Sequence, residues 1–173
     1  RTAAVGATTV LLVEDNPADA RLIRELLREG APDAEVTWVT TAAEAREAVN
    51  RGVGAVLLDL GLPDAHGLDA LRAVREANDA VPVVVLSGDD DEDLAIAAVA
   101  EGAQDYLVKG RVDGDLLARA LRYAGTRHRA EMLLAAQTNV LQLIAAGALL
   151  TESLEAVARL VDDRCDGVAC AIM

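Results

Sequence analysis

The sequence predicts an α/β fold in which helices cover both faces of a five-stranded parallel sheet. Residues 10–13, 56–58 and 81–86 form short apolar runs without polar alternation. Such runs are typical of strands that are buried on both faces of a parallel sheet. Strand-like and helix-like segments alternate five times along roughly the first 120 residues, which is typical of parallel strands joined by helical crossovers.

The composition allows one ordinary domain with an additional segment, because domains most often contain about 100 to 150 residues and this chain has 173. Hydrophobic residues make up 53% of the chain, which is enough for a core. The only aromatic residues are Trp38, Tyr106 and Tyr123, so the core must consist mainly of Ala, Val and Leu. Since the chain begins at Arg1 and stops within an apolar run at Met173, we expect it to be a piece of a longer protein.

The net charge and the cysteines exclude several classes of function. A net charge of −13 argues against direct binding of nucleic acid, which requires clustered Lys and Arg. Cys165 and Cys170 have no further Cys or His near them, so we expect reduced thiols rather than a disulfide or a metal site.

No segment approaches the roughly 20 apolar residues of a membrane span, and the N-terminus has no apolar signal region. We therefore expect a cytoplasmic protein.

The first strand, residues 10–13, is followed by a predicted helix. Asn16 is a favourable N-cap, Pro17 suits the first helical position, and Gly30 ends the helix. The residues expected to be buried on this helix are Leu22, Ile23, Leu26 and Leu27.

The middle of the chain continues the alternation. Residues 35–39 alternate enough to form an outer strand, and residues 41–50 form a short Ala-rich helix. The apolar run that starts at Ala55 ends on Asp59 and then breaks into a Gly/Pro loop. An Asp at this place either is positioned for chemistry or simply forms a turn.

The remaining elements follow the same order. After His66 and Gly67, a helix carries Leu68, Leu71 and Val74 in register and ends before Pro82. The strand over residues 81–86 ends in Ser87 and Gly88. Acids at residues 89–93 then open a helix, and we expect them to cap it rather than to bind metal. Its predicted apolar side consists of Leu94, Ile96, Ala97 and Val99, and residues 104–108 form the last strand before Lys109.

Polar side chains gather where the predicted strands end. Because parallel strands end at the same edge of a sheet, we expect a single cluster there; its members are Glu14, Asp15, Asp59, Ser87 and Lys109. Three carboxylates repel one another and need a cation or protons. Mg²⁺ suits them because it takes oxygen ligands and shares sites with phosphate.

The same cluster suggests phosphoryl transfer. One carboxylate serves as the nucleophile, the metal and Lys109 neutralise the transferred group, and Ser87 adds a hydroxyl donor. The chain has no Gly-rich phosphate loop ending in Gly-Lys-Ser/Thr, so the phosphoryl donor must bring its own recognition. Taken singly, Lys109 and Tyr106 are also compatible with ordinary strand ends, and Ser87 with a simple cap.

Residues 8–123 resemble the receiver domain of bacterial two-component response regulators. The motifs that carry the resemblance are LVEDN (12–16), LDLGLPD (58–64) with Gly67, LSG (86–88) and DYLVK (105–109).

The resemblance implies a flavodoxin-like strand order, 2-1-3-4-5, and a set of roles. Asp59 accepts a phosphoryl group from a histidine kinase or phosphotransfer protein, and Lys109 contacts that group. Glu14 and Asp15 hold Mg²⁺ together with Asp59 and the backbone carbonyl of Gly61. Ser87 and Tyr106 switch conformation and remodel the face formed by the fourth helix and fifth strand.

Two positions depart from the family pattern. Lys109 is followed by Gly110, where the family often has a cis proline, and Glu14 stands where Asp is commoner. Neither change removes a required charged group. His66 and His128 are expected in solvent rather than in a catalytic role.

The last third predicts a long helix. No proline occurs between residues 112 and 146, and 4-3 spacing gives an imperfect heptad seam formed by Leu116, Ala120, Tyr123, Arg127, Ala130, Leu134, Gln137, Leu141 and Ile144. We expect this helix to form a coiled coil in a parallel homodimer; the alternative is a helix folded back on its own domain. Residues 8–124 are assigned to the receiver, 125–147 to a signalling helix, and 148–173 resemble the start of a GAF domain.

These observations predict a phosphorylation-dependent signalling switch that relays its state through the C-terminal helix, without turnover of an external substrate. One alternative is a metal-dependent phosphohydrolase with an aspartyl nucleophile, which is disfavoured because Gly61 stands where such enzymes have a second Asp. Another is a dimerisation module whose acidic pocket is idle.

Overall fold

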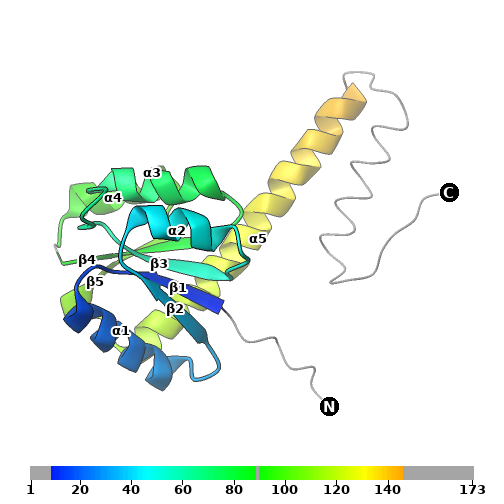
Figure 1. The fold of residues 1–173 in the computed structure, drawn as a ribbon. Coiled ribbons are helices and arrows are strands. Elements are labelled where there is room, and N and C mark those ends of the chain that lie inside the picture. Colours follow the sequence, from blue (N-terminus) through cyan, green and yellow to red (C-terminus); the bar gives the residue numbers. More distant parts are fainter. Residues whose placement is uncertain (1–8, 89, 146–173) are drawn as a thin grey trace, which may run out of the picture. The chain divides into compact units, whose positions relative to one another are not determined.

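The computed structural model describes residues 9–88 and 90–145, and it has the predicted α/β architecture. Five parallel strands form one sheet in the order β2-β1-β3-β4-β5. Helices cover both faces of this sheet (Figure 1). The five-stranded parallel sheet and the flavodoxin-like order are therefore confirmed.

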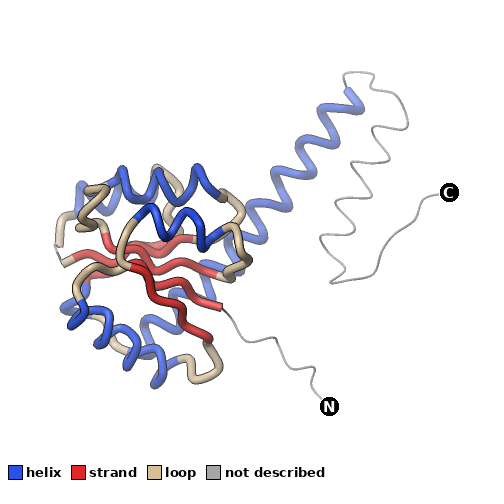
Figure 2. The backbone as a smooth tube through the Cα atoms, viewed as in Figure 1, coloured by secondary structure: helices blue, strands red, loops and turns tan. Residues whose placement is uncertain are grey.

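Strands and helices alternate along the chain, as Figure 2 shows. The strands are β1 (Thr9–Val13), β2 (Glu35–Val39), β3 (Ala55–Asp59), β4 (Val83–Ser87) and β5 (Asp105–Val108). The helices are α1 (Pro17–Gly30), α2 (Ala42–Val49), α3 (Leu68–Ala77), α4 (Glu92–Ala100) and α5 (Gly114–Ala145), with a 3-10 turn over Lys109–Arg111. Asn16 caps α1 as predicted, since its side chain accepts a hydrogen bond from the Ala18 N–H at 2.9 Å.

The sheet separates the core into two layers. One layer lies under α2, α3 and α4 and includes Leu11, Leu58 and Leu71. The other lies under α1 and α5 and includes Leu12, Leu57 and Leu117. Neighbouring residues of β1 and β3 thus enter opposite layers, which explains why these strands show no polar alternation. Each fully buried Leu contributes about 1.5 to 3 kcal/mol to folding.

Gly30 and Gly114 mark a close approach of α1 and α5. A Cβ built on Gly30 would lie 1.9 Å from the carbonyl oxygen of Gly114, and a Cβ on Gly114 would lie 2.8 Å from the carbonyl oxygen of Leu26. The sequence predicted Gly30 as a helix stop. It is indeed the last residue of α1, but the contact with α5 gives it a second role.

The predicted buried side of α1 was right for Ile23 and Leu27 but wrong for Leu22. Leu22 is 51% exposed, because the buried side of α1 follows Ala20, Ile23 and Leu27 at helical spacing. Leu26, predicted to be buried, is only partly so.

The fourth helix and one histidine also differ from the prediction. On α4, Ile96 is 62% exposed and Val99 42%, whereas Ala98 is the residue that is buried. This helix is apolar nearly all round, so its sequence does not identify the side that faces the sheet. His128 was predicted in solvent, yet its side chain is buried; His66 is exposed, as expected.

Helix α5 continues past the receiver domain predicted at residues 8–124 and ends at Ala145. Contacts divide the chain into two units, Arg1–His128 and Arg129–Met173. The GAF-like segment predicted at residues 148–173 lies outside the described residues. Among the helices that the structure describes, none combines the length and the apolar character that a membrane crossing requires.

Candidate functional site

The carboxyl ends of four strands bring the predicted site residues to one edge of the sheet. Glu14 follows β1 and is completely buried, while Asp59 ends β3 with 7% exposure and Ser87 ends β4 with 5%. Asp15 is exposed. Carboxylate oxygens of Glu14, Asp15 and Asp59 all lie within 4.8 Å of one another. The structure therefore places the three predicted metal-binding carboxylates together.

Lys109 lies among these acids. Its Nζ is 2.5 Å from Oε2 of Glu14 and 2.9 Å from Oδ1 of Asp59. A third carboxylate, Asp19 on α1, places Oδ2 at 3.1 Å from the same nitrogen. An ammonium group has three N–H donors, the same number as the carboxylates that lie within 3.1 Å of Nζ. The Lys109–Gly110 peptide bond is trans, and Lys109 begins the 3-10 turn.

The charges in the cluster are unbalanced. Burial raises the pKa of Glu14 above its ordinary value, and the charge of Asp59 adds to this, although the hydrogen bond from Lys109 acts in the opposite direction. Burial acts to lower the pKa of Lys109, but hydrogen bonds to Glu14 and Asp59 outweigh it and the pKa is raised. Lys109 is therefore a cation at neutral pH. Its single positive charge offsets one of the four negative charges, which leaves three in excess. The four carboxylates are those of Glu14, Asp15, Asp19 and Asp59.

The loop after β3 is held at both ends. The Gly61 N–H donates to Oδ2 of Asp59 at 3.0 Å, and the Gly67 N–H donates to the carbonyl of Leu60 at 2.8 Å. Gly67 has φ +57°, which favours glycine. Asp64 accepts hydrogen bonds from the N–H groups of Ala42 (2.9 Å) and Ala43 (3.0 Å) at the start of α2. These contacts fix Gly61, a predicted metal-binding position, next to Asp59.

The two predicted switch residues lie on adjacent strands. Ser87 pairs in register with Val108, and Tyr106 pairs with Val85 two residues earlier. Tyr106 is half-buried and packs against the core layer under α2, α3 and α4. Ser87 thus belongs to the carboxylate edge, while Tyr106 lies farther down β5 toward the core.

Two residues near the site were not singled out from the sequence. In the sequence, Asp19 looks like any acid in the first turn of a helix. In the structure, its carboxylate contacts Lys109. Trp38, the single tryptophan of the chain, donates from Nε1 to the backbone carbonyl oxygen of Glu14 at 2.8 Å. Both contacts join residues that are far apart in the sequence, so no local sequence pattern predicts them.

One of the acids before α4 caps the helix as predicted. Asp91 caps this helix by accepting a hydrogen bond from the Leu94 N–H at 3.0 Å. Asp90 pairs with Arg111 at 2.7 Å on the surface.

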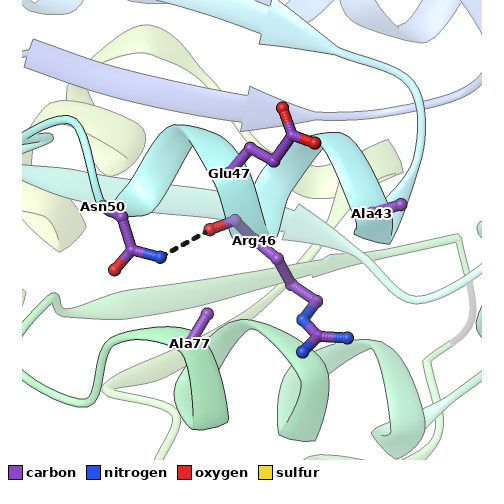
Figure 3. A pocket seen from close by; sticks show the side chains of 5 residues that line it. All are labelled: Ala43, Arg46, Glu47, Asn50 and Ala77. Atoms are coloured by element: carbon purple, nitrogen blue, oxygen red, sulfur yellow. Dashed lines mark hydrogen bonds between the residues drawn. The ribbon is translucent and has the colours of Figure 1, made fainter.

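An open pocket of about 410 Å³ lies elsewhere, between α2 and α3 (Figure 3). It is lined by Ala43, Arg46, Glu47, Asn50 and Ala77. The Asn50 side-chain amide donates to the carbonyl of Arg46 at 3.1 Å. None of the lining residues belongs to the carboxylate cluster.

Comparisons with known proteins identify the family of this chain. The family model of the response regulator receiver domain matches residues 10–121. The KDP operon transcriptional regulatory protein KdpE of Escherichia coli is 43% identical over 123 residues, which cover 71% of this chain and 53% of that protein. The cell cycle transcriptional regulator CtrA of Caulobacter vibrioides is 36% identical over 114 residues, which cover 64% of this chain and 47% of CtrA. This chain thus spans about half the length of the curated relatives it matches.

Solved structures show the same fold. The signal receiver domain of a putative Luxo repressor protein from Vibrio parahaemolyticus has a TM-score of 0.64 and 27% identity, covering 74% of this chain and 97% of the domain. The Mn²⁺-bound form of the response regulator Rcp1 has a TM-score of 0.54 and 30% identity, covering 66% of this chain and 90% of Rcp1. Taken with the match over residues 10–121, these similarities show that the chain belongs to the response regulator receiver domain family.

Proposed function

We propose that this receiver is a phosphorylation-dependent switch with Asp59 as the phospho-acceptor. The observation that carries the proposal is the convergence of Lys109 and three carboxylates at the end of β3. Asp59 is the central member, because Oδ1 pairs with Lys109 and Oδ2 accepts the Gly61 N–H. A carboxylate held between a cation and a backbone donor has a fixed orientation, which favours attack on an incoming phosphorus atom.

Mg²⁺ is the metal we propose for the carboxylate cluster. Glu14, Asp15 and Asp59 offer only oxygen ligands, and the backbone carbonyl of Gly61 is proposed as a further ligand. The excess of three negative charges favours a divalent cation, and Mg²⁺ binds readily beside one or two carboxylates and phosphate oxygens. Bound there, the metal offsets charge on the transferred phosphoryl group. The Mn²⁺-bound form of the related Rcp1 supports a divalent ion in this family.

The proposed reaction moves a phosphoryl group from a phosphohistidine of a histidine kinase or phosphotransfer protein. A carboxylate oxygen of Asp59 attacks phosphorus, the P–N bond breaks as the O–P bond forms, and the donor imidazole leaves with the bond electrons. Lys109 then shifts its contact from the Asp59 carboxylate to the phosphoryl oxygens. Ser87 turns its hydroxyl toward the new group and Tyr106 changes rotamer, which conveys the change to α4 and β5.

We propose that α5 relays the state of the site and pairs with the α5 of a second copy of the chain. Leu134 and Leu141 lie seven residues apart and are 63% and 66% exposed, as expected for an uncovered heptad seam. Replacing both with Gln is expected to weaken dimerisation in sedimentation measurements. Met132→Gln is the control, because Met132 is exposed but lies off the seam. An equal loss in the control, or a monomeric parent, would contradict this pairing.

KdpE and CtrA are named transcriptional regulators, but this chain covers about half of each. Because its net charge is −13, we propose that the chain itself does not contact DNA.

The test of the proposed function is the intact mass of the protein after incubation with Mg²⁺ and phosphoramidate. The parent should gain one phosphoryl group and Asp59→Asn none. Asp79→Asn is the matched control, since Asp79 is an exposed acid outside the cluster and this variant should be modified like the parent. Modification of Asp59→Asn would show that the acceptor is another residue.

Two further outcomes would favour the alternatives. Binding of Mg²⁺ without any added mass would favour a dimerisation module with an idle pocket. Steady hydrolysis of an external phosphate ester would favour a phosphohydrolase, whereas we propose that the receiver turns over no external substrate.

A further inference from the structure

We propose that Asp19 is a positioning residue that holds the Lys109 ammonium for phosphoryl transfer. This inference rests on the proposed function. Its basis is the 3.1 Å contact between Oδ2 of Asp19 and Nζ of Lys109, which joins α1 to the end of β5 across 90 residues of sequence.

Asp19 differs from the other two partners of Lys109. Glu14 and Asp59 belong to the carboxylate cluster that fits a metal ion, and Asp19 does not. A divalent cation bound to the oxygens of Glu14 and Asp59 would weaken their electrostatic attraction to the Lys109 ammonium, because the same negative charges would then be shared between two cations. Among the described residues that contact Lys109, Asp19 is the carboxylate that stays available to it.

The position of Asp19 suits an anchor. It lies in the first turn of α1, where the Ala18 N–H donates to the Asn16 side chain and the Ala20 N–H donates to the Asn16 carbonyl oxygen. Lys109, by contrast, carries its charge on a flexible four-carbon stem. A carboxylate on a capped helix therefore limits the positions that the ammonium can take, and it leaves two N–H donors to point at Asp59 and the incoming group.

A purely structural role for Asp19 is the main competing explanation. An acid in a first helical turn stabilises the helix dipole whatever else it contacts. Asp115 provides the matched control, because it is an exposed acid in the first turn of α5. If only the dipole matters, Asp19→Asn and Asp115→Asn should behave alike.

The experiment measures the rate of phosphorylation by phosphoramidate at saturating Mg²⁺ over a range of donor concentrations. Asp19→Asn is expected to lower the maximal rate about 3- to 10-fold, the scale of one lost hydrogen bond, while the donor concentration at half-maximal rate stays within about twofold. Asp19→Glu should recover most of the rate, since it keeps the charge. Asp115→Asn should match the parent.

A double-mutant cycle with Lys109→Met separates positioning from helix stability. If Asp19 acts through Lys109, Asp19→Asn should cause no further loss of rate in the Lys109→Met background. An equal loss in both backgrounds, or an unchanged maximal rate in Asp19→Asn alone, would overturn the inference and leave the proposed function intact. A parent chain that gains no phosphoryl group would overturn the proposed function and the inference with it.

Discussion

Alanine at position 30 is expected to destabilise the receiver, because α1 and α5 approach there without room for a side chain. The added Cβ would lie 1.9 Å from the oxygen and 2.4 Å from the carbon of the Gly114 carbonyl, whereas ordinary contact begins at 3.4 Å. Both are backbone atoms, so they cannot rotate away. The two helices must separate by about 1.5 Å at this point, and overpacking on this scale costs about 1 to 3 kcal/mol.

The matched control is the same substitution in an open part of α5. A Cβ at Gly125 meets nothing within 4 Å, and replacing a helical Gly with Ala stabilises by roughly 0.5 to 1 kcal/mol. Urea unfolding followed by circular dichroism should therefore give a lower midpoint for Gly30→Ala and a higher one for Gly125→Ala, each with an unchanged slope. Equal midpoints for the two variants, or a Gly30→Ala protein as stable as the parent, would refute the packing argument.

Other predictions concern charges around the site; the stability predictions are tested by urea unfolding in EDTA, and the metal prediction by fluorescence without EDTA. Since the pKa of Glu14 is raised on folding, the parent should lose stability as pH rises from 4.5 through the folded pKa, and Glu14→Gln should lack this loss; parallel pH curves would contradict it. The raised pKa of Lys109 provides stability that is fully present below pH 10.5 and is lost as pH rises through its folded pKa. Lys109→Met should abolish that alkaline loss and cost about 3 kcal/mol at pH 7, because it leaves buried carboxylates unpaired; a cost below about 1 kcal/mol would show that the pair matters little. Asp64→Ala should cost about 1 kcal/mol as α2 loses two backbone contacts, whereas no change would mean that solvent replaces them. Emission from Trp38 should change when Mg²⁺ is added, since its indole donates to Glu14, and an unchanged spectrum despite bound metal would contradict that coupling.

Much of the fold and the site could be predicted because the relevant signals are local. The unalternating run at residues 56–58 indicated a strand buried on both faces, and β3 is buried along its whole length. Asn16 and Pro17 located the start of α1. Parallel strands end at one edge whatever their side chains, so the approach of Glu14, Asp59 and Lys109 followed from strand order and direction alone.

The sequence by itself determined the alternation of strands and helices and the edge at which the acids meet. Tertiary structure decided which side of α4 is buried and that His128 is covered. It also decided that Gly30 is required by a neighbouring helix and that Asp19 shares Lys109 with the cluster. The physical reason is that the hydrophobic periodicity of a helix or strand, and the capping of a helix, depend only on residues that are close together in the sequence. A contact such as Asp19 with Lys109 joins side chains 90 residues apart, and it exists only once the sheet has set the distance between them.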